Sequence, residues 1–136
     1  MTADTVTARA GLKTILIVDD EPMLREAIAD VLRDEGYIAL EGSDGREAVE
    51  LFARERPDLV LMDVMMPILD GRQALALIRS AQSRPPTPIV MMSAAVGPAM
   101  LDASIAGYLA KPFDLDRLVD LVIELIGRPP QSDGRP

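Results

Sequence analysis

The chain has 136 residues, a formal net charge of −8 at pH 7 and 49% hydrophobic residues, which predicts one globular domain with a sizeable core. Such an acidic composition argues against direct nucleic-acid binding, because phosphate contacts need clustered lysine and arginine. The sequence has no cysteine and no histidine, which excludes disulfides, thiolate metal sites and histidine acid–base catalysis. Any metal would need oxygen ligands, which favours magnesium, calcium or manganese.

The ends of the chain differ in composition from its middle. Residues 1–12 are mostly small, polar and unpatterned, and residues 128–136 are polar after Pro129-Pro130, so we expect both to be flexible tails. Residues 13–127 should then form the single domain. No run approaches the roughly 20 apolar residues of a membrane span, and no signal-peptide pattern is present, so we expect a cytoplasmic protein without membrane contact.

Five short, largely apolar runs predict strands. They cover residues 14–18, 37–41, 59–63, 89–92 and 107–111. The runs at 14–18, 59–63 and 89–92 are nearly uninterrupted, which is typical of strands buried on both faces of a parallel sheet.

Amphipathic segments alternate with these runs and predict helices. The first begins at Pro22 and stops at Gly36, and the others cover about 45–56, 71–81 and 114–126. The alternation indicates an α/β fold with a doubly wound, five-stranded parallel sheet. We expect the flavodoxin-like strand order 2-1-3-4-5.

Polar residues close four of the five predicted strands. They are Asp19 and Asp20 after the first, Asp63 at the third, Ser93 at the fourth and Lys111 at the fifth. Ligands bind at the carboxyl ends of parallel strands, and the strand order brings the three carboxylates together. Like charges resist ionising side by side, so the cluster favours a hard cation, for which Mg²⁺ is the natural candidate.

The same set can accept a phosphoryl group. Aspartate is a nucleophile for phosphorus, and a metal ion and the Lys111 ammonium would neutralise the charge on the transferring oxygens. Ser93 adds a hydroxyl donor.

Each residue also has a simpler interpretation. Acids at 19–21 can serve a helix N-terminus, Asp63 and Ser93 can be turn residues, Tyr108 a strand aromatic and Lys111 a surface lysine. Their joint placement favours a site over these alternatives. The methionines near the strands are interpreted as core residues: Met62, Met65, Met66, Met91 and Met92.

Four motifs in this order resemble the receiver domain of two-component response regulators. They are Val18–Pro22, Met62–Pro67 followed by Asp70-Gly71, Ser93-Ala94, and Tyr108–Phe113. The resemblance covers about residues 14–126. It implies a signalling domain and not an enzyme, which takes a phosphoryl group from a sensor histidine kinase or phosphotransfer protein. Its output would be a conformational switch read by a downstream protein partner or an output domain.

The resemblance also implies roles for individual residues. Asp63 would be the phosphoryl acceptor, and Lys111 would contact the phosphoryl oxygens. Asp20 and Asp63 would bind Mg²⁺ directly, Asp19 would act largely through water, and the Met65 carbonyl would complete the protein ligands.

Two further residues would form the switch. Ser93 would move toward the bound phosphoryl group, and Tyr108 would turn inward behind it. The resemblance also implies a cis peptide bond between Lys111 and Pro112.

One stretch departs from the family pattern. The segment between Ser93 and Lys111 is about one helical turn shorter than usual and contains Gly97-Pro98. We therefore expect a short or irregular fourth helix, with residues 95–105 the most mobile part of the domain. A receiver-like binding module without phosphotransfer stays an alternative. A phosphoaspartyl phosphatase of the haloacid dehalogenase type is less favoured, because Met65 stands where its second aspartate would be.

The last predicted helix has an unusually wide apolar arc of roughly 200°. The residues expected to face the core are Leu115, Val119, Val122, Ile123 and Ile126. Leu121 and Leu125 are left near the rim. They either fill a gap beside a short fourth helix or form a surface for a partner or a homodimer.

Overall fold

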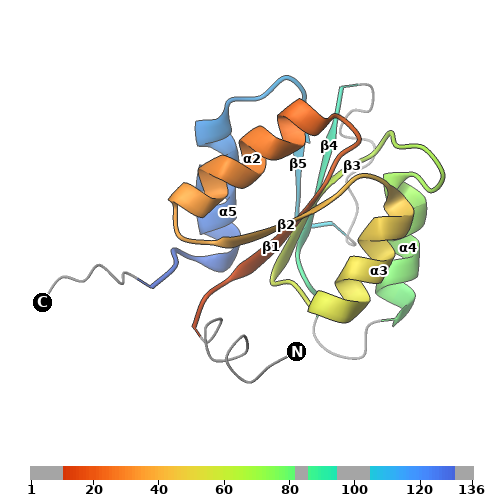
Figure 1. Ribbon diagram of the computed structural model, residues 1–136, viewed down its shortest axis with the longest axis horizontal. Helices are drawn as coiled ribbons and strands as arrows, with labels where there is room; N and C mark the ends of the chain where they lie inside the picture. The colour runs from red at the N-terminus through yellow and green to blue at the C-terminus, as the bar shows by residue number, and fades with distance from the viewer. Residues whose placement is uncertain (1–10, 82–85, 95–104, 131–136) are drawn as a thin grey trace, which may run out of the picture.

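The computed structural model describes residues 11–81, 86–94 and 105–130. Its five strands form one parallel sheet in the order β2-β1-β3-β4-β5, which confirms the predicted topology (Figure 1). The strands are β1 Thr14–Val18, β2 Ile38–Gly42, β3 Leu59–Asp63, β4 Ile89–Ser93 and β5 Gly107–Ala110. The predicted boundaries are correct to within one residue.

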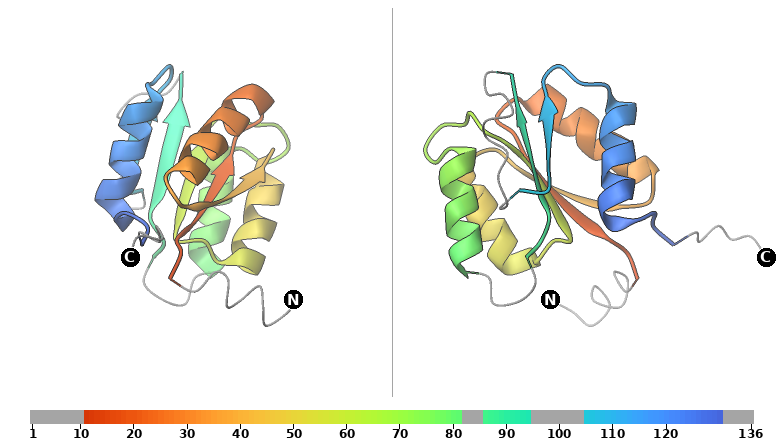
Figure 2. Two further views of the ribbon diagram at one scale, coloured as in Figure 1. Left: turned by 60° about the vertical axis from the view of Figure 1, so that its left-hand side comes forward. Right: turned by 180° about the vertical axis from the view of Figure 1, so that it is seen from behind.

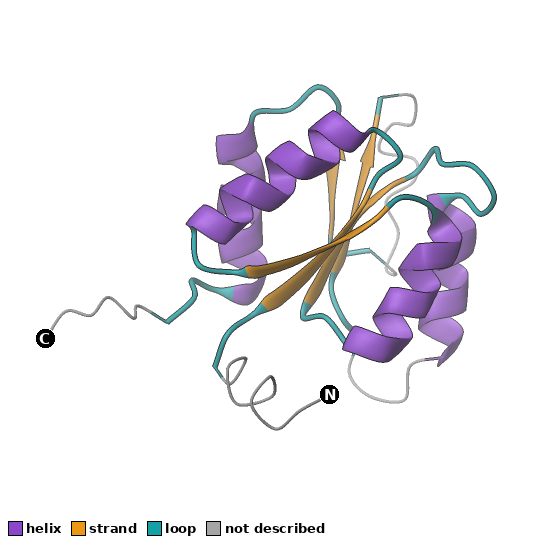
Figure 3. Cartoon of the chain, viewed as in Figure 1, coloured by secondary structure: helices purple, strands orange, loops and turns teal. Residues whose placement is uncertain are grey.

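Four helices of the described residues cover the two faces of this sheet. They are α2 Pro22–Asp34, α3 Gly45–Glu55, α4 Gly71–Ala81 and α5 Leu115–Ile126. Helices α2 and α5 lie on one face, and α3 and α4 lie on the other (Figures 2 and 3). The expectations for residues 95–104 fall outside the described residues. Within the described residues, no helix combines the length and apolarity that a membrane span requires.

The double cover explains the apolar strands. Every residue of β1, β3 and β4 is buried, because alternate side chains enter opposite cores. Ile15 and Ile17 of β1 pack toward α2 and α5, whereas Leu16 and Val18 pack toward α3 and α4. The sheet is therefore held from both sides, which fixes the positions of its strand ends.

Helix α5 corrects one prediction about the core. Leu118, omitted from the predicted core set, is fully buried, as is Val122. Val119 is also buried, whereas Ile123 is only partly buried. The partly buried Leu115, Leu121, Leu125 and Ile126 also pack against this core. Leu121 lies over Gly107 of β5, where an added Cβ would be 3.5 Å from its Cδ2 atom. This contact supports the packing interpretation of Leu121, and a partner role for Leu121 and Leu125 stays a prediction.

The methionine prediction is correct in four of five cases. Met62, Met66, Met91 and Met92 are buried between the sheet and α3–α4 or α2–α5. Met65 is 60% exposed, so its assignment to the core is wrong. It follows β3, where the chain has already left the sheet and turned toward water.

Polar groups near the amino ends of the strands pair through hydrogen bonds in which at most one partner is charged. The Thr14 N–H donates to Asp58 Oδ2 at 2.8 Å, and the Asp58 N–H donates to the Thr14 carbonyl at 2.7 Å. The Tyr37 hydroxyl donates to the Gly127 carbonyl at 2.7 Å. These bonds join β1 to the start of β3, and the start of β2 to the end of α5.

Candidate functional site

The carboxyl ends of the strands bring the predicted polar residues to one edge of the sheet. Asp63 and Ser93 end β3 and β4, whereas Asp19 and Lys111 follow β1 and β5 directly. The parallel registers keep these ends level, with Val18 beside Met62 and Asp63 beside Met92. Asp19, Asp63 and Ser93 are buried. Burying an ionised carboxylate costs free energy unless the group is paired with a cation or a hydrogen-bond donor. The partners of these residues therefore determine the chemistry of this edge of the sheet.

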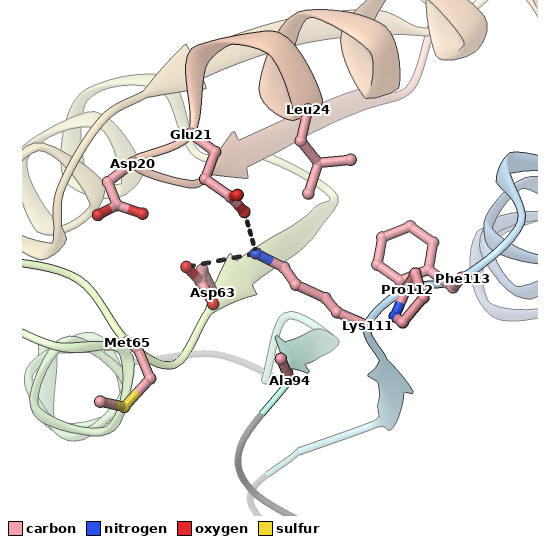
Figure 4. Close-up of a pocket in the computed structure, with 9 residues that line it drawn as sticks. All are labelled: Asp20, Glu21, Leu24, Asp63, Met65, Ala94, Lys111, Pro112 and Phe113. Carbon is pink, nitrogen blue, oxygen red and sulfur yellow. Dashed lines mark hydrogen bonds and ion pairs between the residues drawn. The ribbon is translucent and has the colours of Figure 1, made fainter.

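Lys111 is the positive charge at this edge. Its Nζ lies 2.9 Å from Asp19 Oδ2, 2.9 Å from Glu21 Oε1 and 3.5 Å from Asp63 Oδ2. Figure 4 shows the lysine reaching between Glu21 and Asp63. Burial alone lowers the pKa of Lys111, but its hydrogen bonds to Glu21 and Asp19 and the charges of Asp19 and Asp63 raise it above the usual 10.5. The lysine is therefore a permanent cation at physiological pH.

Asp63 is the carboxylate most affected by its surroundings. Burial, followed by the charge of Asp19, raises the pKa of Asp63 from 3.8 to about 6, and Asp20 adds to the effect. Lys111 and the Met65 N–H oppose this shift without cancelling it. One lysine is thus insufficient compensation for the ionised carboxylates, and the site favours a further positive charge.

Three carboxylates are placed for such a charge. Asp19, Asp20 and Asp63 each offer an oxygen atom, and these atoms all lie within 4.8 Å of one another. Oxygen donors of this kind suit Mg²⁺, and the exposed Asp20 leaves the cluster open to the water molecules that this ion retains. The donor set therefore fits the predicted magnesium site.

The turn after β1 is held in place by its own hydrogen bonds. Asp19 Oδ1 accepts the Glu21 N–H at 2.9 Å, and the Asp19 carbonyl accepts from Arg25 Nη1 at 2.8 Å. Arg25 Nε also donates to Glu41 Oε1 at 3.1 Å, which ties α2 to β2 behind the site. Asp19 is consequently a fixed group at the base of the cluster.

A cavity of about 610 Å³ opens beside Asp63. Its polar wall contains Asp20, Glu21, Asp63 and Lys111, and its apolar wall is formed by Leu24, Met65, Ala94, Pro112 and Phe113 (Figure 4). The acceptor candidate is thus reachable by a reactant although its own side chain is largely buried.

The two predicted switch residues contact each other. The Ser93 carbonyl accepts the Lys111 N–H at 2.9 Å and the Tyr108 hydroxyl at 3.2 Å. Tyr108 is partly buried and packs against the core on the α3–α4 side. The bond between Lys111 and Pro112 is cis, as the resemblance predicts.

Several residues that shape the site are missing from the predicted set. Glu21 pairs with Lys111, and Arg25 donates to the Asp19 carbonyl. The positions of these residues in the sequence do not predict either contact. Gly71 belongs to one of the four motifs without an assigned role, yet a Cβ there would collide with the Asp63 carbonyl. A Cβ on Gly45 would collide with the Leu69 carbonyl, so α3 closely supports the loop after β3.

Residues 15–123 match the response regulator receiver domain family. The chain belongs to this family. Among curated relatives, the transcriptional regulatory protein PdtaR of Mycobacterium tuberculosis H37Rv is 39% identical over 134 residues, covering 94% of this chain and 64% of PdtaR. The response regulator MprA of Mycolicibacterium vanbaalenii is 39% identical over 122 residues, covering 88% and 53%. This receiver chain thus spans between about half and two thirds of the length of these relatives.

Solved receiver domains share the fold of this one. The receiver domain of the sensor histidine kinase PA1611 from Pseudomonas aeruginosa PAO1 has a TM-score of 0.77 and 35% identity, covering 85% of this chain and 98% of its own. That structure holds a magnesium ion in its active site cleft. The chemotaxis response regulator CheY4 of Vibrio cholerae has a TM-score of 0.77 and 28% identity, with coverage of 85% and 99%.

Proposed function

We propose that this receiver domain accepts one phosphoryl group on Asp63 from a phosphohistidine of a sensor histidine kinase or phosphotransfer protein. The observation that carries the proposal is the setting of Asp63. It is a buried carboxylate that faces Lys111 Nζ at 3.5 Å and opens onto a cavity of about 610 Å³. We place this exchange in the cytoplasm.

The transfer is a displacement at phosphorus. An oxygen of ionised Asp63 forms the new bond while the P–N bond of the phosphohistidine breaks, and the bonding pair leaves with the imidazole nitrogen. Lys111 stabilises the negative charge on the phosphoryl oxygens, because its ammonium already faces Asp63. Catalysis by this chain is limited to its own phosphorylation and dephosphorylation.

Asp19, Asp20 and Asp63 would hold Mg²⁺, with the Met65 carbonyl as a further ligand. Their three oxygen donors and the ion in the cleft of the PA1611 receiver domain support this assignment. When bound, the ion supplies positive charge that compensates the carboxylates and the phosphoryl oxygens.

The output of the reaction is a shift between two conformations. Ser93 would move toward the phosphoryl group and Tyr108 would turn inward, and the hydrogen bond from Tyr108 to the Ser93 carbonyl supports their coupling. A downstream protein or an output domain would read the change. Leu121 and Leu125 on α5 are candidates for that contact or for a homodimer.

The proposal is tested by intact-protein mass after incubation with Mg²⁺ and acetyl phosphate. We expect one phosphoryl addition that is lost in Asp63→Ala and lost when EDTA removes the metal. No addition to the wild type, or an addition that survives Asp63→Ala, would contradict the proposal and favour a constitutive binding module.

A further inference from the structure

Glu21 contacts the lysine of the acceptor site although it belongs to neither the proposed acceptor nor the proposed metal ligands. Its Oε1 lies 2.9 Å from Lys111 Nζ, closer than the 3.5 Å that separates Nζ from Asp63 Oδ2. In Figure 4 Glu21 and Asp63 approach the same ammonium group. The resting lysine is therefore held more closely by Glu21 than by the acceptor.

The backbone of Glu21 is fixed, but its side chain has no capping role. Glu21 is the N-cap residue of α2, and its side chain makes no hydrogen bond to the helix. Its N–H donates to Asp19 Oδ1, and its carbonyl accepts the Arg25 N–H. The carboxylate is thus held where it can reach Lys111 without a competing task in α2.

Burial separates the three carboxylates around Lys111. The Asp19 side chain is 0% exposed and that of Asp63 is 6% exposed, whereas the Glu21 side chain is 62% exposed. A buried carboxylate that loses its cation suffers a large desolvation penalty, but an exposed one is rehydrated. Glu21 is therefore the partner that Lys111 can release most easily.

We infer that Glu21 is a displaceable counter-ion of Lys111, which stabilises the unphosphorylated site and leaves the lysine when Asp63 is phosphorylated. This inference rests on the proposed function and makes Glu21 a positioning residue that acts through Lys111. Lysine has three N–H donors, of which Asp19 and Glu21 each take one at 2.9 Å. A phosphoryl group on Asp63 brings several anionic oxygens to the same ammonium, and these repel the Glu21 carboxylate.

The inference predicts different effects on the gain and the loss of the phosphoryl group. With acetyl phosphate, the bond between an Asp63 oxygen and phosphorus forms while the P–O bond to acetate breaks, and acetate leaves with the bonding pair. Glu21 stabilises the state before this step, so its removal should speed phosphorylation about two- to fivefold, as expected for one ion pair with an exposed partner. Dephosphorylation starts after Glu21 has left Lys111, so its rate should change less than about twofold.

The experiment compares Glu21→Gln and Glu21→Asp with the wild type at saturating Mg²⁺, by intact-protein mass during phosphorylation and after removal of the donor. Glu21→Asp keeps the negative charge but shortens the side chain by one methylene. It therefore distinguishes loss of the contact with Lys111 from loss of electrostatic repulsion toward the anionic phosphodonor. Glu26→Gln removes the same charge from an exposed position of the same helix and is the control.

We expect faster phosphorylation in Glu21→Gln, at least half of that gain in Glu21→Asp, and wild-type rates in Glu26→Gln. A wild-type rate in Glu21→Gln or Glu21→Asp, or equal changes in gain and loss, would overturn the inference. Failure of the wild type to be labelled on Asp63 would instead overturn the proposed function.

A measurement without any phosphodonor tests the contact directly. The ammonium protons of Lys111, followed by ¹⁵Nζ NMR, should exchange with water faster in Glu21→Gln than in the wild type, because one hydrogen bond is lost. Unchanged exchange would overturn the inference whatever the outcome of the labelling.

Discussion

Two aspartates flank β3, and the protein uses them in opposite ways. Asp58 precedes the strand, is exposed, and accepts one backbone N–H from Thr14 at 2.8 Å. Asp63 ends the strand, is buried, and shares a single lysine with Asp19 and Glu21. The first carboxylate joins two strands, whereas the second is held in surroundings that disfavour its own charge.

The difference shows at which end of β3 a carboxylate lies in electrostatically unfavourable surroundings. At the amino end of β3, Asp58 and Thr14 are paired by two hydrogen bonds. At the carboxyl end the pKa of Asp63 is raised to about 6, since burial and Asp19 outweigh Lys111. A raised pKa in a cleft is typical of a functional site.

The largest contrast should appear in phosphorylation itself. Asp63→Asn removes the nucleophile, so labelling by acetyl phosphate should fall by about 100-fold or more. Asp58→Asn keeps an acceptor oxygen for Thr14 and should label within about twofold of the wild type. Equal losses in the two variants, measured by intact-protein mass, would mean that the two ends of β3 do not differ in function.

Lys111→Met should have the largest effect on stability. It leaves the buried carboxylates of Asp19 and Asp63 without their cation, and we expect a loss of about 2–4 kcal/mol in the free energy of unfolding at pH 7. Arg46→Met, which removes the exposed ion pair with Glu50, is the control and should cost about 1 kcal/mol or less. Urea denaturation in EDTA measures both, and similar losses would argue against an uncompensated site.

Removing the charge of Asp63 should stabilise the metal-free fold. The folded protein binds the Asp63 proton more tightly than the unfolded chain does, so ionisation weakens the fold as pH rises from about 4 to 6. Asp63→Asn avoids this loss, and its advantage should grow over that range to about 1–3 kcal/mol and stay constant above it.

Thermal denaturation at several pH values in EDTA tests this expectation. Asp58→Asn is the matched control and should give no stabilisation. An Asp63→Asn advantage that is already complete at pH 4 would contradict the electrostatic explanation, because Asp63 is then still protonated in the folded wild type and only about half ionised in the unfolded chain.

The smallest predicted effect lies at the amino end of the sheet. Tyr37→Phe removes the hydroxyl that donates to the Gly127 carbonyl, at a cost of about 1 kcal/mol. Phosphorylation should stay at the wild-type rate, since this bond joins β2 to the end of α5, away from Asp63. A changed labelling rate would show that the two ends of the sheet are coupled.

The backbone of the site follows from local patterns. Buried apolar runs and alternating helices predict the strand order, and the order alone brings Asp19, Asp63 and Ser93 to one edge. Lys111 joins them because β5 is parallel to β4. These placements depend on chain direction and period, which short stretches of sequence contain.

Side-chain pairing is less predictable. Glu21 reaches Lys111 across 90 positions, and that contact depends on how β1 and β5 are spaced by the strands between them. The burial of Leu118 likewise depends on how α5 is rotated against the sheet, and a wide apolar arc permits several rotations. The exposure of Met65 depends on where the chain leaves β3.

The two tyrosines give this protein an intrinsic fluorescence probe. The sequence has two tyrosines and no tryptophan, and Tyr37 and Tyr108 contact opposite parts of the fold through Gly127 and Ser93. In Tyr37→Phe all tyrosine emission comes from Tyr108, one hydrogen bond from the end of β4. Its fluorescence would report conformational change beside the acceptor in real time, without any attached dye.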